Sequence, residues 1–137
     1  MEKKITEPIA KLLDGKNFAF FATIMGDGSP QITPVWVDYD KDTDTILVNT
    51  AEGRLKHKNI LKDPRVSISV ANQSNPYEMV TTRGKVIEQI TDGAAEHTDK
   101  LAKKYMGLDK YPYYSPNEKR VILKIKPEKI FYQQPQG

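Results

Sequence analysis

Apolar and polar positions alternate in short runs along most of the chain, and a helical spacing appears in three stretches. From Ile5 to Leu13 the apolar residues recur at three- and four-residue intervals, which predicts an amphipathic helix that ends near Gly15. A short basic helix is expected from Gly53 to Leu61. It should end before Pro64, because proline disfavours a helical conformation in the residue before it. A third helix is expected from Thr91, as its cap, to about Met106.

The other apolar runs predict strands joined mostly by tight turns. The run from Phe18 to Met25 is nearly continuous, which is typical of a central strand buried on both faces. The tetrapeptide Gly-Asp-Gly-Ser at 26–29 is a hairpin signal. The strand after it, 31–39, carries Pro34, which cannot donate to a ladder and therefore predicts an edge or a bulge. Further strands are expected at 45–49, 66–70, 77–90 with a bend at Gly84, 121–125 and 130–132.

Six or seven strands joined mostly by hairpins, with one short helix inserted, indicate a mainly β fold built as an antiparallel barrel. The early strands are short, so we expect the sheet to curl and close. With 137 residues and no repeat, low-complexity segment or linker, the chain is expected to form one domain over residues 1–137.

Composition narrows the classes of function. Hydrophobic residues make up 38% and charged residues 28% of the chain, which indicates a globular protein. The absence of cysteine excludes disulfides, thiolate catalysis and Cys-ligated metal sites, and His57 and His97 are too few for a histidine-rich one, so no metal is expected. No apolar run approaches the roughly 20 residues of a membrane span and nothing resembles a signal peptide, so we expect a cytoplasmic protein that binds no membrane.

The net charge of +3 suits a small anionic ligand but falls short of a nucleic-acid-binding signature. A barrel that binds RNA or single-stranded DNA would need aromatic residues interleaved with cations on one open face. Here the cations gather near one helix and in the tails, so no nucleic acid partner is expected.

Most residues that could bind a ligand lie at 44–70, a segment predicted to form a strand, a Gly-containing loop, a basic helix and a second strand. Thr50, Arg54, Lys56 and Asn59 crowd the point where the strand gives way to the helix N-terminus. Free backbone N–H groups, the positive end of the helix dipole and cationic side chains can converge on one anion there. Our hypothesis is that the anion is the phosphate tail of a flavin-like cofactor.

From the charges alone, a second interpretation stays open. Arg54, Lys58 and Lys62 follow one another at helical spacing and can form a solvated basic face. Likewise, Tyr105, Tyr111, Tyr113 and Tyr114 can form either a flap over a substrate or a self-packed surface loop.

Three segments carry a family resemblance: SPQITPVWVDYD, TILVNTAEGRLKHKNILKDPRVSISV and NPYEMVTTRGKVIEQIT. In order and spacing they resemble the pyridoxamine 5′-phosphate oxidase-like split β-barrel flavoproteins, and most closely the deazaflavin branch that depends on coenzyme F420. The likeness runs from about residue 18 to residue 125. One departure is the absence of a C-terminal Arg-x-His element, which argues against oxidation of vitamin B6.

The resemblance implies a split antiparallel β-barrel that forms a homodimer, with the cofactor in a groove between the protomers. It also implies a role for twelve positions. The phosphate end is assigned to Arg54, Lys56 and Asn59, the ring edge to Thr33, Pro34, Val35 and Trp36, support of the ring or chain to Asn49, Thr50 and Ala51, and contacts from the neighbouring strand of either subunit to Tyr77 and Met79.

No Ser-His-Asp set is visible, and four aspartates between 38 and 44 are most simply solvating charges, so no catalytic side chain is assigned. This fits a redox enzyme whose cofactor supplies the chemistry. We therefore expect hydride transfer between reduced F420 and a small conjugated organic substrate, with any proton coming from water or a tyrosine.

Two alternatives stay open. FMN shares the tricyclic ring, ribityl chain and phosphate, so the chain can be an FMN-dependent flavoprotein of the same family. F420 adds an acidic tail, for which Lys58, Arg83 and Lys85 are candidate partners. The chain can also be a flavin- or haem-binding protein without turnover.

Overall fold

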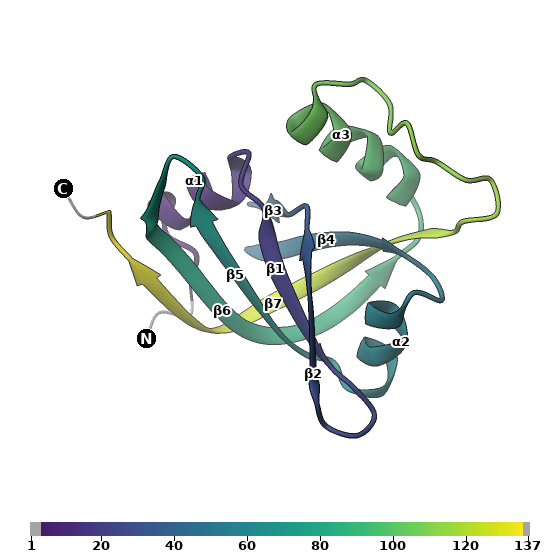
Figure 1. The fold of residues 1–137 in the computed structure, drawn as a ribbon, viewed down its shortest axis with the longest axis horizontal. Coiled ribbons are helices and arrows are strands. Elements are labelled where there is room, and N and C mark those ends of the chain that lie inside the picture. The colour runs from purple at the N-terminus through teal and green to yellow at the C-terminus, as the bar shows by residue number, and fades with distance from the viewer. Residues whose placement is uncertain (1–3, 136–137) are drawn as a thin grey trace.

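The computed structural model describes residues 4–135, in which one antiparallel sheet is accompanied by three helices (Figure 1). The expected mainly β class is confirmed. The strands are β1 (Ala19–Ile24), β2 (Pro30–Val35), β3 (Asp38–Asp40), β4 (Thr45–Ala51), β5 (Arg65–Asn72), β6 (Asn75–Ile90) and β7 (Arg120–Gln133). The helices are α1 (Glu7–Asp14), α2 (Leu55–Lys62) and α3 (Ala94–Met106).

The sheet has the strand order β2-β1-β5-β6-β7-β4-β3 and does not close, contrary to expectation. The two ends of the sheet explain this. β2 contains Pro30 and Pro34, which have no N–H to donate, so the predicted edge position of this strand is confirmed. β3, at the other end, has only three residues, too few to build a second ladder.

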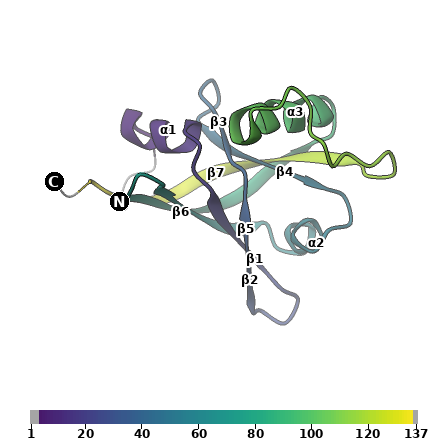
Figure 2. The ribbon, with the colours of Figure 1, turned by 45° about the horizontal axis from the view of Figure 1, so that its top comes forward.

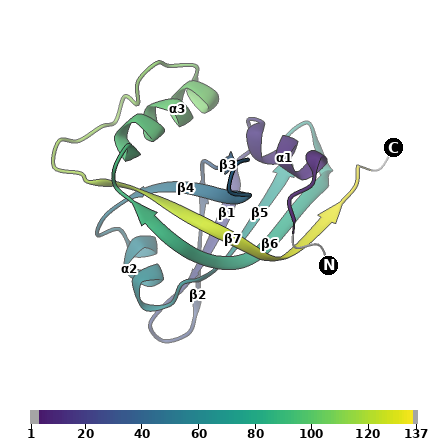
Figure 3. The same cartoon turned by 180° about the vertical axis from the view of Figure 1, so that it is seen from behind.

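β6 and β7 are the longest strands and bend together along the sheet (Figures 1 and 3). Their register shifts at Gly84, which confirms the predicted bend there. A side chain at Gly84 would collide with the Lys126 carbonyl oxygen, so glycine is required by this close approach. The two strands expected at 121–125 and 130–132 are one strand, because the shifted register accommodates Pro127 opposite Gly84.

β1 is central, between β2 and β5, but it is not buried on both faces as expected. Phe21 is buried in the core, whereas Phe18 and Phe20 are each half exposed. The reason is that helices cover only one face of this part of the sheet. The opposite face presents further exposed apolar side chains, including Ile32 and Phe131.

The helices position the site. α1 buries Ile9, Leu12 and Leu13 in the core and ends at Gly15, as expected. α3 is capped by Gly93 in a left-handed conformation, so the expected cap at Thr91 is wrong. Figure 2 shows α1 and α3 above β4 and β7, while α2 lies apart from them and contacts β1. None of the helices within residues 4–135 is long and apolar enough to cross a membrane.

Candidate functional site

A pocket of about 410 Å³ lies between α3, the start of α2, and strands β2 and β4. We call it the α2–α3 pocket. One part of its wall is aromatic and another is polar and cationic. The aromatic part comprises Phe18, Trp36, Tyr105, Tyr111 and Tyr113, the polar part comprises Asn49, Thr50, Arg54, Lys56, Thr98 and Arg120, and Pro34, Val35, Leu101 and Met106 complete the lining.

The cationic part forms where β4 hands over to α2. Gly53 adopts a positive φ of 88°, which turns the chain, and its N–H donates to Nδ1 of the buried His57 at 3.2 Å. Arg54 is then the cap of α2, and Lys56 lies in the first turn. No side chain caps this helix start, so its N–H groups remain available to an anion.

Lys56 carries the least compensated charge of the pocket. Within residues 4–135 no carboxylate forms an ion pair with it, whereas Arg54 pairs with Glu118 at 2.6 Å. Partial burial lowers the pKa of Lys56, and the nearby Arg54 and Arg120 charges lower it further. An anion bound between these cations would reverse that unfavourable balance.

Thr50 contributes an unsatisfied polar atom to the same wall. The residue is 1% exposed, and among the described residues its hydroxyl has no hydrogen-bond partner. Buried hydroxyls are normally paired, and leaving one unpaired costs about 1–3 kcal/mol. The hydroxyl has no exposed surface in the pocket, because strand alternation places it on the opposite face of β4 from the Asn49 side chain.

The aromatic part is a packed cluster. Trp36 and Tyr105 stack with ring centroids 5.2 Å apart and planes within 4°, and Tyr111 meets Trp36 edge-on at 5.9 Å. Tyr105 belongs to α3 and is buried, with its hydroxyl bonded to the Asn17 carbonyl at 2.7 Å, so it is not part of a flap. Tyr111 and Tyr113 do line the pocket from the 107–119 connection, but Tyr114 does not.

Seven of the twelve sequence-predicted positions come together here: Pro34, Val35, Trp36, Asn49, Thr50, Arg54 and Lys56. Thr33 lines a smaller neighbouring depression that it shares with Lys56. Ala51 is buried beside the pocket wall on β4.

The other three predicted positions lie elsewhere in the chain. The amide of Asn59 is buried and donates to Thr23 Oγ1 at 3.0 Å and to Met25 Sδ at 3.3 Å, so it ties α2 to β1. Tyr77 and Met79 lie near the start of β6, outside the lining of the pocket. Their predicted role therefore depends on a second subunit.

Arg120 is the charged residue of the pocket lining that the sequence analysis missed. It is 9% exposed, precedes the apolar run of β7, and lies with its guanidinium carbon 5.7 Å from the Tyr111 ring centroid. A cation directly before an apolar strand was the available signal, but nothing local distinguishes it from a surface arginine.

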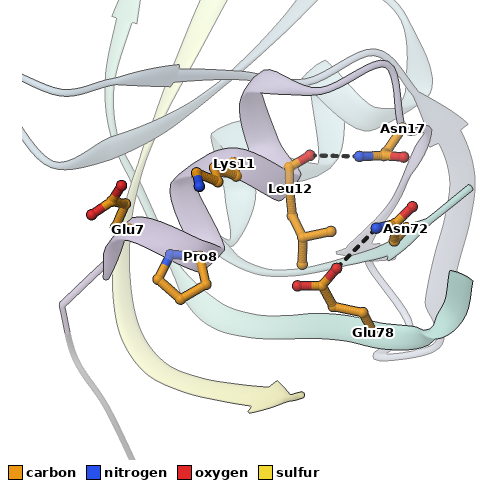
Figure 4. Close-up of a pocket in the computed structure, with 7 residues that line it drawn as sticks. All are labelled: Glu7, Pro8, Lys11, Leu12, Asn17, Asn72 and Glu78. Atoms are coloured by element: carbon orange, nitrogen blue, oxygen red, sulfur yellow. Dashed lines mark hydrogen bonds between the residues drawn. The ribbon is translucent and has the colours of Figure 1, made fainter. Parts of the chain in front are cut away.

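A second pocket, of about 420 Å³, lies beside α1 and differs in chemistry. We call it the α1 pocket; it is lined by Glu7, Pro8, Lys11, Leu12, Asn17, Asn72 and Glu78 (Figure 4). Asn17 donates to the Leu12 carbonyl and Asn72 donates to Glu78, and Tyr132 also donates to Glu78 at 2.5 Å. The polar side chains of Asn17, Asn72 and Glu78 are thus paired within the protein.

The family model for pyridoxamine 5′-phosphate oxidase matches residues 5–134. Among solved structures, an F420 reductase is 27% identical, with a TM-score of 0.79 over 93% of this chain and 98% of that one.

Two more distant structures share the fold. HupZ from Group A Streptococcus is 24% identical, with a TM-score of 0.68 over 97% of this chain and 99% of that one. General Stress Protein 26 from Bacillus anthracis is 18% identical, with a TM-score of 0.67 over 95% of this chain and 94% of that one.

Proposed function

This chain belongs to the pyridoxamine 5′-phosphate oxidase family, and we propose that within it the protein is an oxidoreductase that uses coenzyme F420. The proposed reaction is hydride transfer between the reduced deazaflavin and a small conjugated organic molecule. The observation that carries the proposal is the α2–α3 pocket, which combines an aromatic wall with an uncompensated cationic end.

The residues of the pocket suit a ligand with a flat ring and a charged tail. Arg54 offers a planar guanidinium and Lys56 a point charge, a donor set that matches phosphate oxygens. Pro34, Val35 and Trp36 lie on the edge strand and in the residue after it, where a ring can contact backbone without disrupting a ladder.

The bound cofactor would supply the hydride chemistry, and the chain would supply binding and orientation. The stacked Trp36 and Tyr105 rings exclude water from one side of the pocket. Burial raises the pKa of Tyr105 to about 12, and its hydroxyl is held between backbone groups, so this residue packs rather than exchanges a proton.

The preference for F420 rests on the likeness to the F420 reductase structure at 27% identity. FMN is the second candidate, and one observation favours it. Lys58, Arg83 and Lys85, the cations expected to meet the acidic F420 tail, are all exposed and none lines the pocket. FMN has a phosphate but no acidic extension, so it would need only the cations that line the α2–α3 pocket.

We also propose that the protein works as a homodimer paired through the uncovered face of the sheet. Phe20, Ile32 and Phe131 are each at least half exposed there, and the strand registers place Ser69 and Thr81 between Phe20 and Phe131. This face continues into the pocket rim at Pro34 and includes Met79, so a second copy would explain why the β6 positions lie outside the pocket of one protomer. Replacing Phe20 and Ile32 with glutamate should convert the dimer to a monomer in sedimentation, whereas a monomeric parent protein would exclude the pairing.

The function is tested by the absorbance spectrum and mass of the ligand released from freshly purified protein, followed by titration with F420 and FMN. We expect tight binding of F420 and its reoxidation by a conjugated acceptor. Tight binding of FMN alone would move the protein to the FMN-dependent alternative. A bound flavin or haem that no acceptor can reoxidise would identify a carrier, and the absence of binding would refute the proposal.

A further inference from the structure

Asn49 faces the α2–α3 pocket, yet its amide has no hydrogen-bonding capacity left for a ligand. Its nitrogen donates to the Ala94 carbonyl at 2.9 Å and contacts His97 Nδ1 at 3.0 Å. Its oxygen accepts from Thr98 Oγ1 at 3.0 Å and from Arg120 Nε at 2.9 Å. Two hydrogens and two lone pairs are thereby used.

Two of these partners fix the orientation of the Asn49 amide, whereas the single hydrogen of Thr98 Oγ1 lies within reach of both the Asn49 oxygen and the Ala94 carbonyl. Arg120 Nε can only donate and the Ala94 carbonyl can only accept, so the Asn49 amide has a single permitted orientation. Its nitrogen must then donate to His97 Nδ1, which leaves the proton of a neutral His97 on Nε2. That proton is donated to Asp38 Oδ2 at 2.9 Å.

Asp38 lies at the end of the hydrogen-bonded series that runs from Asn49 through His97. It is 5% exposed and also accepts from Lys100 Nζ at 3.1 Å and from the Tyr39 N–H at 2.9 Å. Burial would raise the pKa of this carboxyl, but the hydrogen bonds from His97 and Lys100 outweigh burial and hold the pKa well below its ordinary value. Asp38 therefore stays ionised and holds His97 in one tautomer.

At the pocket end of this series, the Arg120 guanidinium is held in one orientation but keeps an unpaired donor nitrogen among the described residues. Its Nε is held by Asn49 and its Nη1 by Glu118, and among the described residues no group accepts a hydrogen bond from Nη2. Glu118 also forms an ion pair with Arg54, so a single carboxylate serves two guanidinium groups. Among the described residues, no carboxylate pairs with Lys56. Positive charge is in excess at this end of the pocket.

We propose that Asp38, His97 and Asn49 form a positioning chain that fixes Arg120 in the pocket, and that Arg120 is the third cation that binds the anionic group of the ligand. The ligand class is an aromatic phosphate, so the inference rests on the proposed function. Asn49 and His97 are positioning residues, because they act through Arg120. Thr98, which also donates to Asn49, completes the support from α3.

The test compares FMN with riboflavin, which has the same ring without the phosphate, in titrations of the full chain. Asn49→Asp keeps the size of the side chain but pairs a carboxylate with Arg120 and removes the donor to His97. We expect this variant and Arg120→Met to bind FMN about ten- to a hundred-fold more weakly, with riboflavin affinity changed much less. If F420 is the ligand, the pair becomes F420 and its phosphate-free deazaflavin core.

Two variants of His97 separate positioning from simple packing. His97→Asn places an acceptor near Nδ1 and should keep FMN affinity, whereas His97→Gln places its polar end near Nε2, loses the contact with Asn49 and should weaken FMN binding about ten-fold. The matched control is Lys104→Met. Lys104 joins α3 to the carbonyls of Leu13 and Val37 and does not line the pocket, so this variant should lower stability without changing the ratio of FMN to riboflavin affinity.

The proposal is overturned if the two His97 variants behave alike, if Lys104→Met changes the ratio as much as His97→Gln, or if Arg120→Met leaves FMN affinity unchanged. A parent protein that binds neither FMN nor F420 would instead refute the proposed function. Unfolding midpoints measured on every variant show which of them fold, and Asn49→Asp preserves side-chain size closely enough to keep at least one arm informative.

Discussion

The α1 pocket and the α2–α3 pocket have nearly the same volume, about 420 and 410 Å³, but opposite chemistry. In the α1 pocket, the polar atoms of Asn17, Asn72 and Glu78 pair with protein groups, and two carboxylates accompany one lysine. In the α2–α3 pocket, three cations and no carboxylate line the wall, and among the described residues the buried Thr50 hydroxyl has no hydrogen-bond partner.

The difference teaches that size does not identify a binding site. A pocket whose polar groups are already paired gains little from a ligand, because each new hydrogen bond replaces an existing one. A pocket with excess positive charge is less stable alone than with an anion bound. The comparison therefore predicts that changes in the two pockets affect ligand affinity and stability differently.

The largest effect is expected for Arg54→Ala combined with Lys56→Ala. Each lost charge-assisted contact is worth about 1.5–3 kcal/mol, so affinity for FMN or F420 should fall about a hundred-fold or more in calorimetric titrations. Both side chains are partly exposed, so the fold should survive. Lys11→Ala removes the cation of the α1 pocket and should leave the affinity for FMN or F420 unchanged. An equal loss of affinity in this variant would mean that the ligand binds in the α1 pocket.

A general loss of stability has to be distinguished from these local losses. Gly84→Ala would drive a methyl group against the Lys126 carbonyl at the β6–β7 register shift. We expect the free energy of unfolding to fall by about 3 kcal/mol in urea denaturation. The folded fraction should still bind FMN or F420 with parental affinity, and a specific loss of affinity would show that the ladder shapes the pocket directly.

Thr50→Val separates stability from binding most clearly. Valine has nearly the shape of threonine, so removing the unpaired hydroxyl should raise the stability of the free protein by about 1 kcal/mol. The same change should leave the affinity for phosphate-containing ligands unchanged, because the hydroxyl has no exposed surface in the pocket. Thermal unfolding with and without ligand measures both effects.

The α1 pocket provides the opposite case. Tyr132→Phe removes a hydrogen bond to Glu78, so it should lower stability by about 1 kcal/mol and leave ligand affinity unchanged. If Thr50→Val also lowered the stability of the free protein, the hydroxyl would have a partner after all, and the contrast between the pockets would lose its basis.

The smallest effect is expected from acid. Because the pKa of Asp38 is depressed in the folded protein below its ordinary value of 3.8, its stabilising contribution is present above 3.8 and is lost progressively as the pH falls from there toward the depressed pKa of the folded state. Urea denaturation from pH 6 down to about pH 3 should therefore show a stability difference between parent and Asp38→Asn that shrinks with falling pH. A difference that grows on acidification would contradict the assigned ion pairs.

Local signals predicted much of the fold. Pro34 marked the edge strand, the glycine-rich turn at 26–29 marked the first hairpin, and Gly84 marked the bend in β6. Each of these depends on the conformation of one or two residues, which sequence reports directly. Closure of the sheet and the burial of β1 depend on what lies against each face, and those expectations were wrong.

The site was predicted where its residues are close in sequence and missed where they are not. Arg54 and Lys56 lie within one turn of α2, so their meeting with Thr50 at the start of that helix follows from local structure. Arg120 meets Asn49 across 71 residues and His97 meets Asp38 across 59. Such pairs are set by the docking of α3 and β7, for which no local pattern exists.

The most direct test of the central claim is a crystal structure of the protein soaked with FMN or F420. The account predicts the phosphate within hydrogen-bond distance of Arg54 and Lys56, with the ring toward Trp36. A phosphate bound in the α1 pocket, or a ring bound with its phosphate away from Lys56, would contradict it.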